Sequence, residues 1–250
     1  MRNLYSEKRI VDATCLDMNL NMSIPEMVRV IEEATFNHSH QMGLDHEDMI
    51  DKSNAFWIVN KIKLSIVHPD IKGYDTIKVS TWTHTPGLVR FNRDNDIKIA
   101  NRVMVRAISE WCCLDATTRR PRKSSSIYYP DVDMVKTKKS NLEYSNLRLE
   151  LSECDYIYTH IVRSTDLDVN NHTNNLRYNY IALNTFRADE LCALDIKEYE
   201  IHFVSESYEG DNIRVYRKKQ RNLHYIEGRV EDKSIFRVVI KSRSQDRAMK

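Results

Sequence analysis

The segment Asp166–Asn175, with the sequence DLDVNNHTNN, is the part of the chain richest in groups that could take part in a reaction. Asp168, Asn170 and His172 are each two positions apart, so in an extended stretch their side chains project to one side. Asn174 is well placed to cap a following helix, whose backbone N–H groups and dipole favour negative charge. A carboxylate, a carboxamide and an imidazole beside such a helix start suit the oxyanion that forms when a carbonyl carbon is attacked. The same spacing also fits an Asn-rich turn and cap without any chemistry.

A second candidate is Glu206, in the segment FVSESYEGD over residues 203–211, where a strand is expected to end before a turn. A carboxylate held at a strand end is able to take a proton from water and so to act as a general base. The alternative interpretation is a solvated charge at a strand end. His172 and Glu206 are far apart in the sequence, so the surrounding elements must bring them together if they act as a pair.

The first half of the chain is predicted to form one strand, one helix and four further strands. Ser23, with Pro25 in the first turn and Glu26 three positions later, marks the start of a helix that runs to about Gln41. Apolar residues at helical spacing place one stripe on this helix for burial, namely Met27, Val30, Ile31 and Ala34. Strands are expected at about 4–11, 58–66, 76–82, 89–97 and 103–113, the second of them with Ile58, Ile62, Leu64 and Ile66 on its buried face.

The second half repeats that order. A strand is expected at 155–162, and four more at 199–205, 212–218, 224–230 and 235–242. Between them a helix is expected from Asn175 to about Leu191, with one side formed by Tyr178, Ile181, Ala182 and Thr185. Such self-similarity indicates a duplicated unit. The predicted class is α+β, each unit being a long helix packed on an antiparallel sheet, because a striped helix is most readily buried against one sheet face.

Composition excludes several classes of protein. The 250 residues include 38 Lys and Arg against 36 Asp and Glu, a net charge of +2, which gives no general argument for nucleic acid or membrane binding. With 41% hydrophobic residues the chain is too apolar for a disordered protein. The start of the sequence has no signal-peptide pattern, and no apolar run reaches about 18 residues. We therefore expect a folded, cytoplasmic protein.

Metal ions and nucleotide cofactors are not indicated by the sequence. The five cysteines form no CxxC pair, the nine histidines form no HExxH motif, and no glycine-rich phosphate loop occurs. His38 and His40, on the first helix, are expected to be ordinary polar residues of the core or the surface. We expect neither a metal site nor a bound cofactor.

DLDVNNHTNN followed by LRYNYIAL, with FVSESYEGD further on, strongly resembles the acyl-acyl carrier protein thioesterases, the chain-terminating hydrolases of fatty acid synthesis in plants and their bacterial relatives. The family signature Asp-x-Asn-x-His-x-Asn-Asn matches residues 168–175. The resemblance implies a tandem, or double, hot-dog fold. It also implies an N-terminal hot-dog at 1–118 that provides the acyl pocket and specificity, a connector at 119–150, and a catalytic C-terminal hot-dog at 151–250.

The resemblance further implies a catalytic set of Asp168, Asn170, His172 and Glu206. We expect Glu206 to activate water, while His172 shares proton transfer or polarises the carbonyl. Asn170 would hold the water or the carbonyl, and Asp168 would orient Asn170 or His172. Ser207 stands where plant members often carry Cys, so a thiolate nucleophile is not implied.

The implied activity is hydrolysis of fatty acyl-acyl carrier protein to free fatty acid, with the carrier protein and its acyl-phosphopantetheine as partner. Two basic clusters could dock an acidic carrier: Arg119, Arg120, Arg122 and Lys123 on the connector, and Arg214, Arg217, Lys218, Lys219 and Arg221 on a late strand and turn. The chain would act as a monomer or a homodimer. The alternatives are an acyl-CoA thioesterase, a hot-dog dehydratase or a non-catalytic acyl-binding protein, because the same fold hosts all of these.

Overall fold

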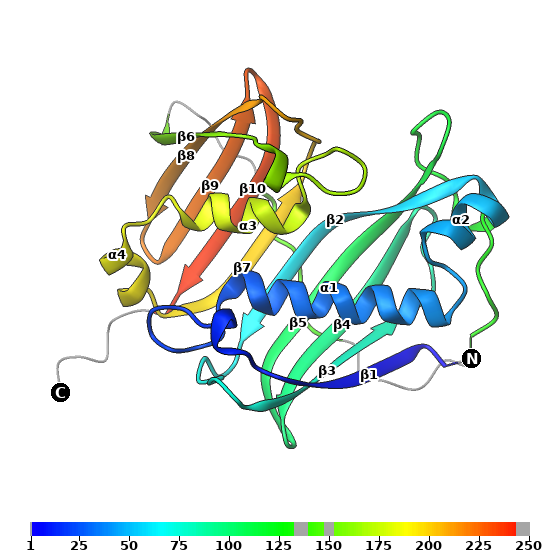
Figure 1. Ribbon diagram of the computed structural model, residues 1–250, viewed down its shortest axis with the longest axis horizontal. Helices are drawn as coiled ribbons and strands as arrows, with labels where there is room; N and C mark the ends of the chain where they lie inside the picture. Colours follow the sequence, from blue (N-terminus) through cyan, green and yellow to red (C-terminus); the bar gives the residue numbers. More distant parts are fainter. Residues whose placement is uncertain (1, 133–139, 148–152, 244–250) are drawn as a thin grey trace. The chain divides into compact units, whose positions relative to one another are not determined.

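The computed structural model describes residues 2–132, 140–147 and 153–243. The chain divides into two compact units, Met1–Leu142 (unit 1) and Glu143–Lys250 (unit 2). Residues 133–139 and 148–150 of the expected connector, and the last residues from 244 onward, lie outside the described part. Each unit combines helices with one layer of antiparallel sheet (Figure 1).

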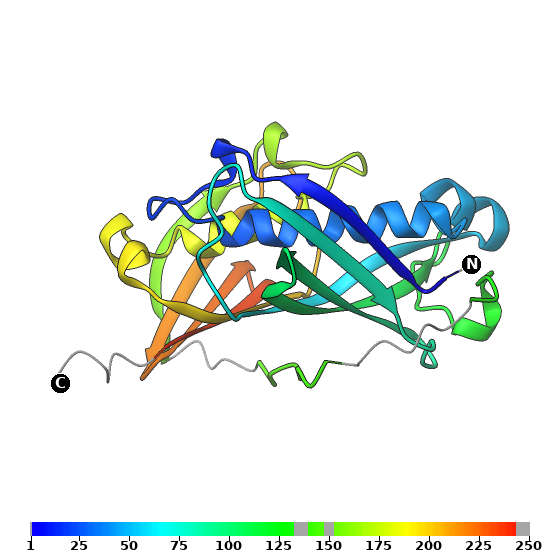
Figure 2. The same cartoon turned by 90° about the horizontal axis from the view of Figure 1, so that it is seen from below.

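Unit 1 is a long helix lying across one face of an antiparallel sheet (Figure 2). Its described residues form the helices α1 (Ile24–Gln41) and α2 (His46–Ser53) and the strands β1 (Leu4–Ile10), β2 (Ala55–Ile66), β3 (Thr76–Thr83), β4 (Arg90–Ile99) and β5 (Arg102–Asp115). Short 3-10 helices lie at Ala13–Cys15 (η1) and Ser124–Ser126 (η2). The strands follow the order β1-β3-β4-β5-β2 across the sheet.

Unit 2 repeats this plan. Its helices are α3 (Asn175–Leu183), α4 (Ala188–Ala193) and the 3-10 helix η4 (Ser164–Asp166). Its strands are β6 (Asp155–Ile161), β7 (Ile196–Phe203), β8 (Asn212–Gln220), β9 (Leu223–Val230) and β10 (Lys233–Ser242). Their order, β6-β8-β9-β10-β7, matches that of unit 1 strand for strand. The predicted duplicated unit of a helix on an antiparallel sheet is confirmed.

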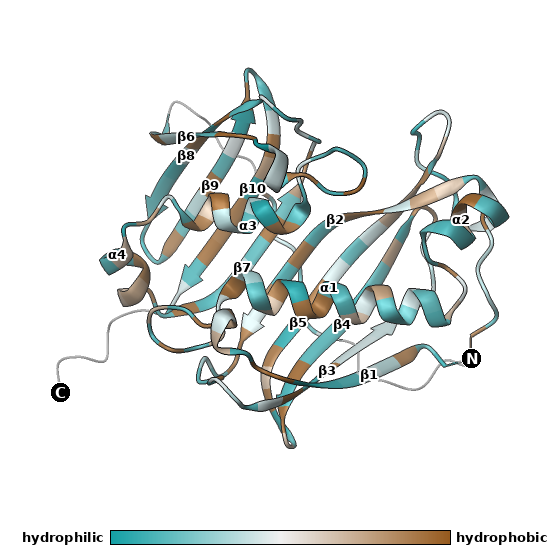
Figure 3. Cartoon of the chain, viewed as in Figure 1, coloured by the Kyte–Doolittle hydropathy of each residue, from teal (hydrophilic) through white to brown (hydrophobic). Residues whose placement is uncertain are grey.

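The core of unit 1 depends on the apolar stripe of α1. The four predicted stripe residues, Met27, Val30, Ile31 and Ala34, are all at most 3% exposed. Figure 3 shows apolar and polar bands along α1, as expected of a helix with one buried side. Neither α1 nor any other helix in the described part of the chain is long and apolar enough to cross a membrane.

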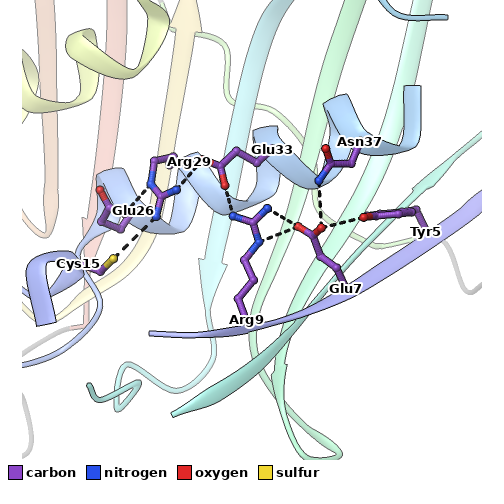
Figure 4. A network of polar contacts seen from close by, with 8 residues as sticks. All are labelled: Tyr5, Glu7, Arg9, Cys15, Glu26, Arg29, Glu33 and Asn37. Atoms are coloured by element: carbon purple, nitrogen blue, oxygen red, sulfur yellow. Dashed lines mark hydrogen bonds and ion pairs between the residues drawn. The ribbon is translucent and has the colours of Figure 1, made fainter. Parts of the chain in front are cut away.

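A polar network joins β1 to α1 (Figure 4). Arg9 of β1 pairs with Glu33 of α1, and Glu33 also accepts from Arg29 at 2.5 Å. Arg29 binds Glu26 as well, at 2.6 Å.

Helix α1 begins where predicted, but the expected capping box is not formed. Ser23 makes no side-chain cap bond, and the Glu26 carboxylate pairs with Arg29 instead.

Strand β2 departs from the predicted alternation. Its pairing with β5 shifts register between Val59 and Lys61, so Asn60 is the extra residue of a β-bulge. The bulge changes the phase of the residues before it, and Val59, 5% exposed, is buried in place of Ile58. After the bulge Ile62, Leu64 and Ile66 are buried as predicted. The alternation is not complete, because Lys63 between them is also buried, at 7% exposed.

The helix predicted from Asn175 to about Leu191 is in fact two helices, α3 and α4. The Thr185 hydroxyl donates to the Ala182 carbonyl at 2.7 Å, a local bond that competes with continuing the helix. A new helix, α4, then starts after Arg187, whose N–H donates to the Glu190 carboxylate at 3.0 Å. The predicted buried side is nevertheless confirmed, since Tyr178, Ile181, Ala182 and Thr185 are each at most 4% exposed.

Candidate active site

His172 and Glu206, far apart in the sequence, lie side by side in unit 2. His172 precedes α3, and Glu206 follows β7 in the loop that leads to β8. The Nδ1 atom of His172 is 3.5 Å from Oε1 of Glu206. Both side chains are partly exposed, 21% for His172 and 36% for Glu206, so water can reach them. The separation is long for a hydrogen bond, but catalytic pairs often tighten only around a substrate.

Tyr208 contacts both members of this pair. Its hydroxyl donates to Oε2 of Glu206 at 3.2 Å. Its ring meets the imidazole of His172 edge to face, with 5.1 Å between the ring centroids. Tyr208 is not among the residues predicted from the sequence, although its position two residues after Glu206 places both side chains on one side of an extended stretch. One aromatic side chain thus holds the carboxylate and flanks the imidazole.

Asp168 shapes the turn that carries His172. Its Oδ1 accepts from the backbone N–H groups of Asn170 at 2.8 Å and His172 at 3.3 Å, and its own N–H donates to the His172 carbonyl at 2.8 Å. Asn171 has a φ of +59°, in the left-handed region that Asn tolerates better than most residues. The segment is therefore a tight turn and not the extended stretch assumed from the spacing. Asp168 orients His172 through the main chain.

Two further contacts fix this turn. Asn174 caps α3 as predicted, since its side chain accepts from the Leu176 N–H at 2.9 Å. The Thr173 N–H donates to the Ser207 carbonyl at 2.9 Å. Because these two residues directly follow His172 and Glu206 in the chain, their bond helps to set the distance between the imidazole and the carboxylate.

The hydroxyl of Ser207 is enclosed by other hydroxyl groups. Ser207 is 0% exposed, and its Oγ lies 2.7 Å from Oγ1 of Thr173 and 2.9 Å from the hydroxyl of Tyr178. Thr173 and Tyr178 are themselves buried, at 3% and 2% exposed. This cluster supports the backbone beside Glu206, and the Ser207 hydroxyl is not open to an incoming substrate.

Asn170 is the predicted residue whose side chain lies apart from the contacts described above. It lies exposed on the turn, and within the described residues its amide makes no hydrogen bond to His172 or Glu206. The structure therefore brings the side chains of His172 and Glu206 together, places Asp168 behind them as a backbone acceptor, and leaves Asn170 at the surface. Among the residues described, no three His, Cys, Asp or Glu side chains lie close enough to hold a metal ion.

Unit 1 contains the same turn before α1. Oδ1 of Asp17 accepts from the N–H groups of Asn19 and Asn21 at 2.8 and 3.0 Å, and the Asp17 N–H donates to the Asn21 carbonyl at 2.7 Å. Leu20 has a φ of +57°, close to that of Asn171 in unit 2. A bridge closes each turn, Leu16 with Met22 in unit 1 and Leu167 with Thr173 in unit 2.

The two turns differ in the groups that could react. Asn21 stands in unit 1 at the position that His172 holds in unit 2. The Met22 N–H donates to the Ile71 carbonyl at 2.8 Å, just as the Thr173 N–H donates to the Ser207 carbonyl in unit 2. Ile71 therefore corresponds to Ser207, and Asp70, the residue before it, corresponds to Glu206. Only the turn of unit 2 carries an imidazole.

The two predicted basic clusters are partly neutralised by acids of their own units. Arg122 pairs with Asp115 at 3.0 Å. Arg217 pairs with Glu190 at 3.3 Å, and Lys218 pairs with Glu153. Several other members are exposed, namely Arg120, Lys123, Arg214, Lys219 and Arg221.

Most of the chain matches two family models. Residues 2–128 match the acyl-ACP thioesterase N-terminal domain, and residues 149–247 match the acyl-ACP thioesterase C-terminal domain. The chain is 26% identical over 195 residues to a chloroplastic acyl-[acyl-carrier-protein] hydrolase of Cuphea viscosissima, covering 70% of this chain and 46% of that protein. It is 23% identical over 232 residues to the chloroplastic oleoyl-acyl carrier protein thioesterase of Coriandrum sativum, covering 83% and 60%. The chain spans about half the length of the curated relatives it matches.

Solved structures share the fold of this chain. An acyl-ACP thioesterase from Bacteroides thetaiotaomicron superimposes with a TM-score of 0.87 at 17% identity, covering 96% of this chain and 98% of that chain. The 12:0-ACP thioesterase from Umbellularia californica superimposes with a TM-score of 0.81 at 20% identity, covering 96% and 94%. At such identities the likeness shows the fold alone, and it confirms the predicted tandem hot-dog architecture.

Proposed function

The chain belongs to the acyl-ACP thioesterase family, and we propose that it hydrolyses the thioester of fatty acyl-acyl carrier protein and so releases free fatty acid, terminating fatty acid synthesis. The observation that carries this proposal is the approach of His172 Nδ1 to within 3.5 Å of Glu206 Oε1, just before the N-terminus of α3. A general base, an imidazole and the positive end of a helix dipole are components that water attack on a thioester carbonyl can use.

In the proposed reaction Glu206 takes a proton from a water molecule, and the water oxygen attacks the thioester carbonyl carbon. Negative charge develops on the carbonyl oxygen, where the positive end of the α3 dipole stabilises it. As the carbon–sulfur bond breaks, the proton held by Glu206 passes through His172 to the departing thiolate of the phosphopantetheine. Asn170, exposed on the turn, holds the water or the carbonyl. The products are a fatty acid and the free carrier thiol.

Asp168 acts in this proposal as a positioning residue. Its Oδ1 accepts the N–H groups of Asn170 and His172, and Asp17 makes the same pair of bonds in unit 1, to Asn19 and Asn21. Since the turn of unit 1 has no imidazole, those bonds serve the backbone there and not a proton transfer. The parallel favours the same backbone role for Asp168.

We assign the chemistry to the C-terminal hot-dog (151–250) and the acyl pocket and specificity to the N-terminal hot-dog (1–118), with 119–150 as the connector. The imidazole in the turn of unit 2 supports the first assignment. A cavity of about 40 Å³ in unit 1, with aromatic walls that include Trp57, Phe91 and Trp111, supports the second. Aromatic walls suit the apolar part of an acyl chain.

The proposed partner is an acyl carrier protein, and the basic cluster on β8 and its turn offers a test. Arg217 and Lys218 already pair with acids of this chain. The exposed Lys219 and Arg221 are therefore the residues predicted to contact the carrier. Reversing both charges to Glu should raise KM for a carrier-linked substrate by about fivefold and leave KM for a CoA-linked substrate nearly unchanged. The same double reversal at the exposed Arg120 and Lys123 tests the other cluster in turn. Equal effects on both substrates would remove the reversed cluster as the docking site.

The test of the function itself is a panel of acyl thioesters of graded chain length, each linked either to acyl carrier protein or to CoA. The proposal predicts turnover of the carrier-linked series, with release of free fatty acid and free thiol in equal amounts. Faster turnover of the CoA series would make the protein an acyl-CoA thioesterase instead. Binding of the acyl chains without turnover would make it an acyl-binding protein.

A further inference from the structure

The cavity in unit 1 is lined by two chemically different kinds of side chain. It lies between α1 and the strands that α1 covers, and a volume of about 40 Å³ gives room for about three water molecules or a small terminal group. Trp57, Phe91 and Trp111 supply aromatic lining. Thr35, Ser39 and Arg93 supply polar lining, so the cavity is not built for hydrocarbon alone.

Arg93 is a buried cation whose neighbours are neutral. The residue is 7% exposed, and its guanidinium donates to Nδ1 of His38 at 2.9 Å, to Oγ of Ser39 at 3.1 Å and to Oγ1 of Thr81 at 3.5 Å. In the described part of the chain no carboxylate pairs with it. Burial lowers the pKa of Arg93 to about 10, so the group stays charged at neutral pH.

His38 does not balance that charge. Arg93 can only donate to Nδ1, so the ring proton must sit on Nε2, which lies 3.3 Å from the Arg2 carbonyl oxygen. Burial, together with the nearby guanidinium, lowers the pKa of His38 to about 4, which keeps the ring neutral. Buried charges in proteins are normally paired, so the guanidinium of Arg93 favours an anionic oxygen in the adjoining cavity.

Thr35 provides a second, independent observation. It is 2% exposed and lines the cavity, yet its Oγ1 has no hydrogen-bond partner among the residues described. Buried hydroxyl groups are normally hydrogen-bonded. A buried hydroxyl and a buried guanidinium at one small cavity together form a polar subsite.

We propose that this subsite, formed by Arg93, Thr35 and Ser39, binds the far end of an acyl chain that ends in a carboxylate, with the aromatic side chains of the lining contacting the methylene groups before it. The proposal rests on the proposed thioesterase function and names its substrate class. A carboxylate matches the guanidinium in charge and accepts from it in the plane of both groups. A terminal hydroxyl uses the same donors without the charge and is expected to bind second best.

The experiment compares three carrier-linked acyl thioesters of one chain length, ending in a methyl, a hydroxyl or a carboxylate group. With the wild-type chain, kcat/KM for the carboxylate-ended substrate should exceed that for the methyl-ended substrate by about tenfold or more. Arg93→Met should reverse this order, and Arg93→Lys should restore part of it. Thr35→Val, which keeps the shape of the side chain, should reduce the preference for oxygen-bearing ends severalfold. This variant provides the test if the Arg93 variants do not fold.

Failure of this inference is distinct from failure of the function. A wild-type preference for the methyl-ended chain that Arg93→Met leaves unaltered would overturn the subsite while keeping the thioesterase. If Arg93→Met weakened all three substrates equally, the residue would serve the shared phosphopantetheine arm, and the terminal-group proposal would be wrong. No hydrolysis of any of the three by the wild-type chain would instead contradict the proposed function.

Discussion

Comparing Asp168→Asn with Asp168→Ala distinguishes the contribution of the hydrogen bonds that Oδ1 accepts from the contribution of the negative charge. Oδ1 of Asp168 accepts two backbone N–H groups, at 2.8 and 3.3 Å. Asn supplies the same acceptor atom without the charge, whereas Ala removes both bonds. At about 1 kcal/mol for each bond, Asp168→Ala loses about 2 kcal/mol of turn stability. That energy corresponds to about a 30-fold loss of rate if the turn must be formed for reaction.

The assay is kcat/KM with a carrier-linked acyl thioester, measured together with the free energy of unfolding in urea. Asp168→Asn should stay within about threefold of the wild-type rate. Asp17→Ala is the matched control, because it removes the same two backbone bonds from the turn of unit 1. It should cost about the same unfolding free energy, about 2 kcal/mol, but leave kcat/KM within about threefold. A loss of about 1,000-fold or more in Asp168→Asn, equal to that in the Ala variant, would show that the charge takes part in the reaction and would refute the positioning role.

Three further predictions concern the pair, the core and the pH dependence of stability. Tyr208→Phe removes the hydroxyl that donates to Glu206 at 3.2 Å and should lower kcat by about 3- to 10-fold with little change in KM; an unchanged kcat would make that contact incidental. At Gly228 a Cβ would lie 2.2 Å from Cε1 of the buried Phe236, so Gly228→Ala should lower the unfolding free energy by about 1–3 kcal/mol, and a chevron or urea titration showing no loss would contradict the packing. The pKa of His38 is lowered by burial and by the adjacent guanidinium from 6.5 to about 4, so the unfolded chain binds a proton that the folded chain does not, and the unfolding free energy should fall by up to about 3 kcal/mol as pH drops from 6.5 toward 4. His38→Gln should flatten that part of the pH profile, and an identical profile in the variant would locate the effect elsewhere.

Periodicity along the chain predicts the strands and the main helix of each unit, because burial of one face imposes it. The stripe of α1 and the buried side of α3 both follow from it. The bulge at Asn60 could not be predicted in this way, since it depends on how β2 pairs with β5. The break after α3 depends on a hydroxyl bond from Thr185 that competes with the helix. The short helix α2 was not predicted, although Asp45 is a residue type typical of a helix N-cap. Its side chain accepts from the Asp48 N–H at 2.9 Å.

The approach of His172 to Glu206 was expected from the sequence, but the geometry of the turn and the contact with Tyr208 were not. Spacing of two suggested an extended stretch, whereas the left-handed Asn171 makes it a turn. In that turn Asp168 acts on the backbone, a role that residue types alone do not distinguish from contact with the imidazole. The copy of the turn in unit 1 could have been predicted from the sequence, because LDMNLN at 16–21 repeats the pattern of LDVNNH at 167–172. The distance between His172 and Glu206 depends on the fold of the whole unit, which local pattern does not fix.

Single-turnover hydrolysis of a carrier-linked acyl thioester by Glu206→Gln tests the central claim most directly. Gln keeps the size of the side chain and an acceptor for the Tyr208 hydroxyl, but it cannot take a proton from water. The account predicts a chemical step slower than wild type by about 1,000-fold or more, with substrate binding unchanged. A rate within about tenfold of wild type would contradict the claim that the Glu206 carboxylate beside His172 activates the attacking water.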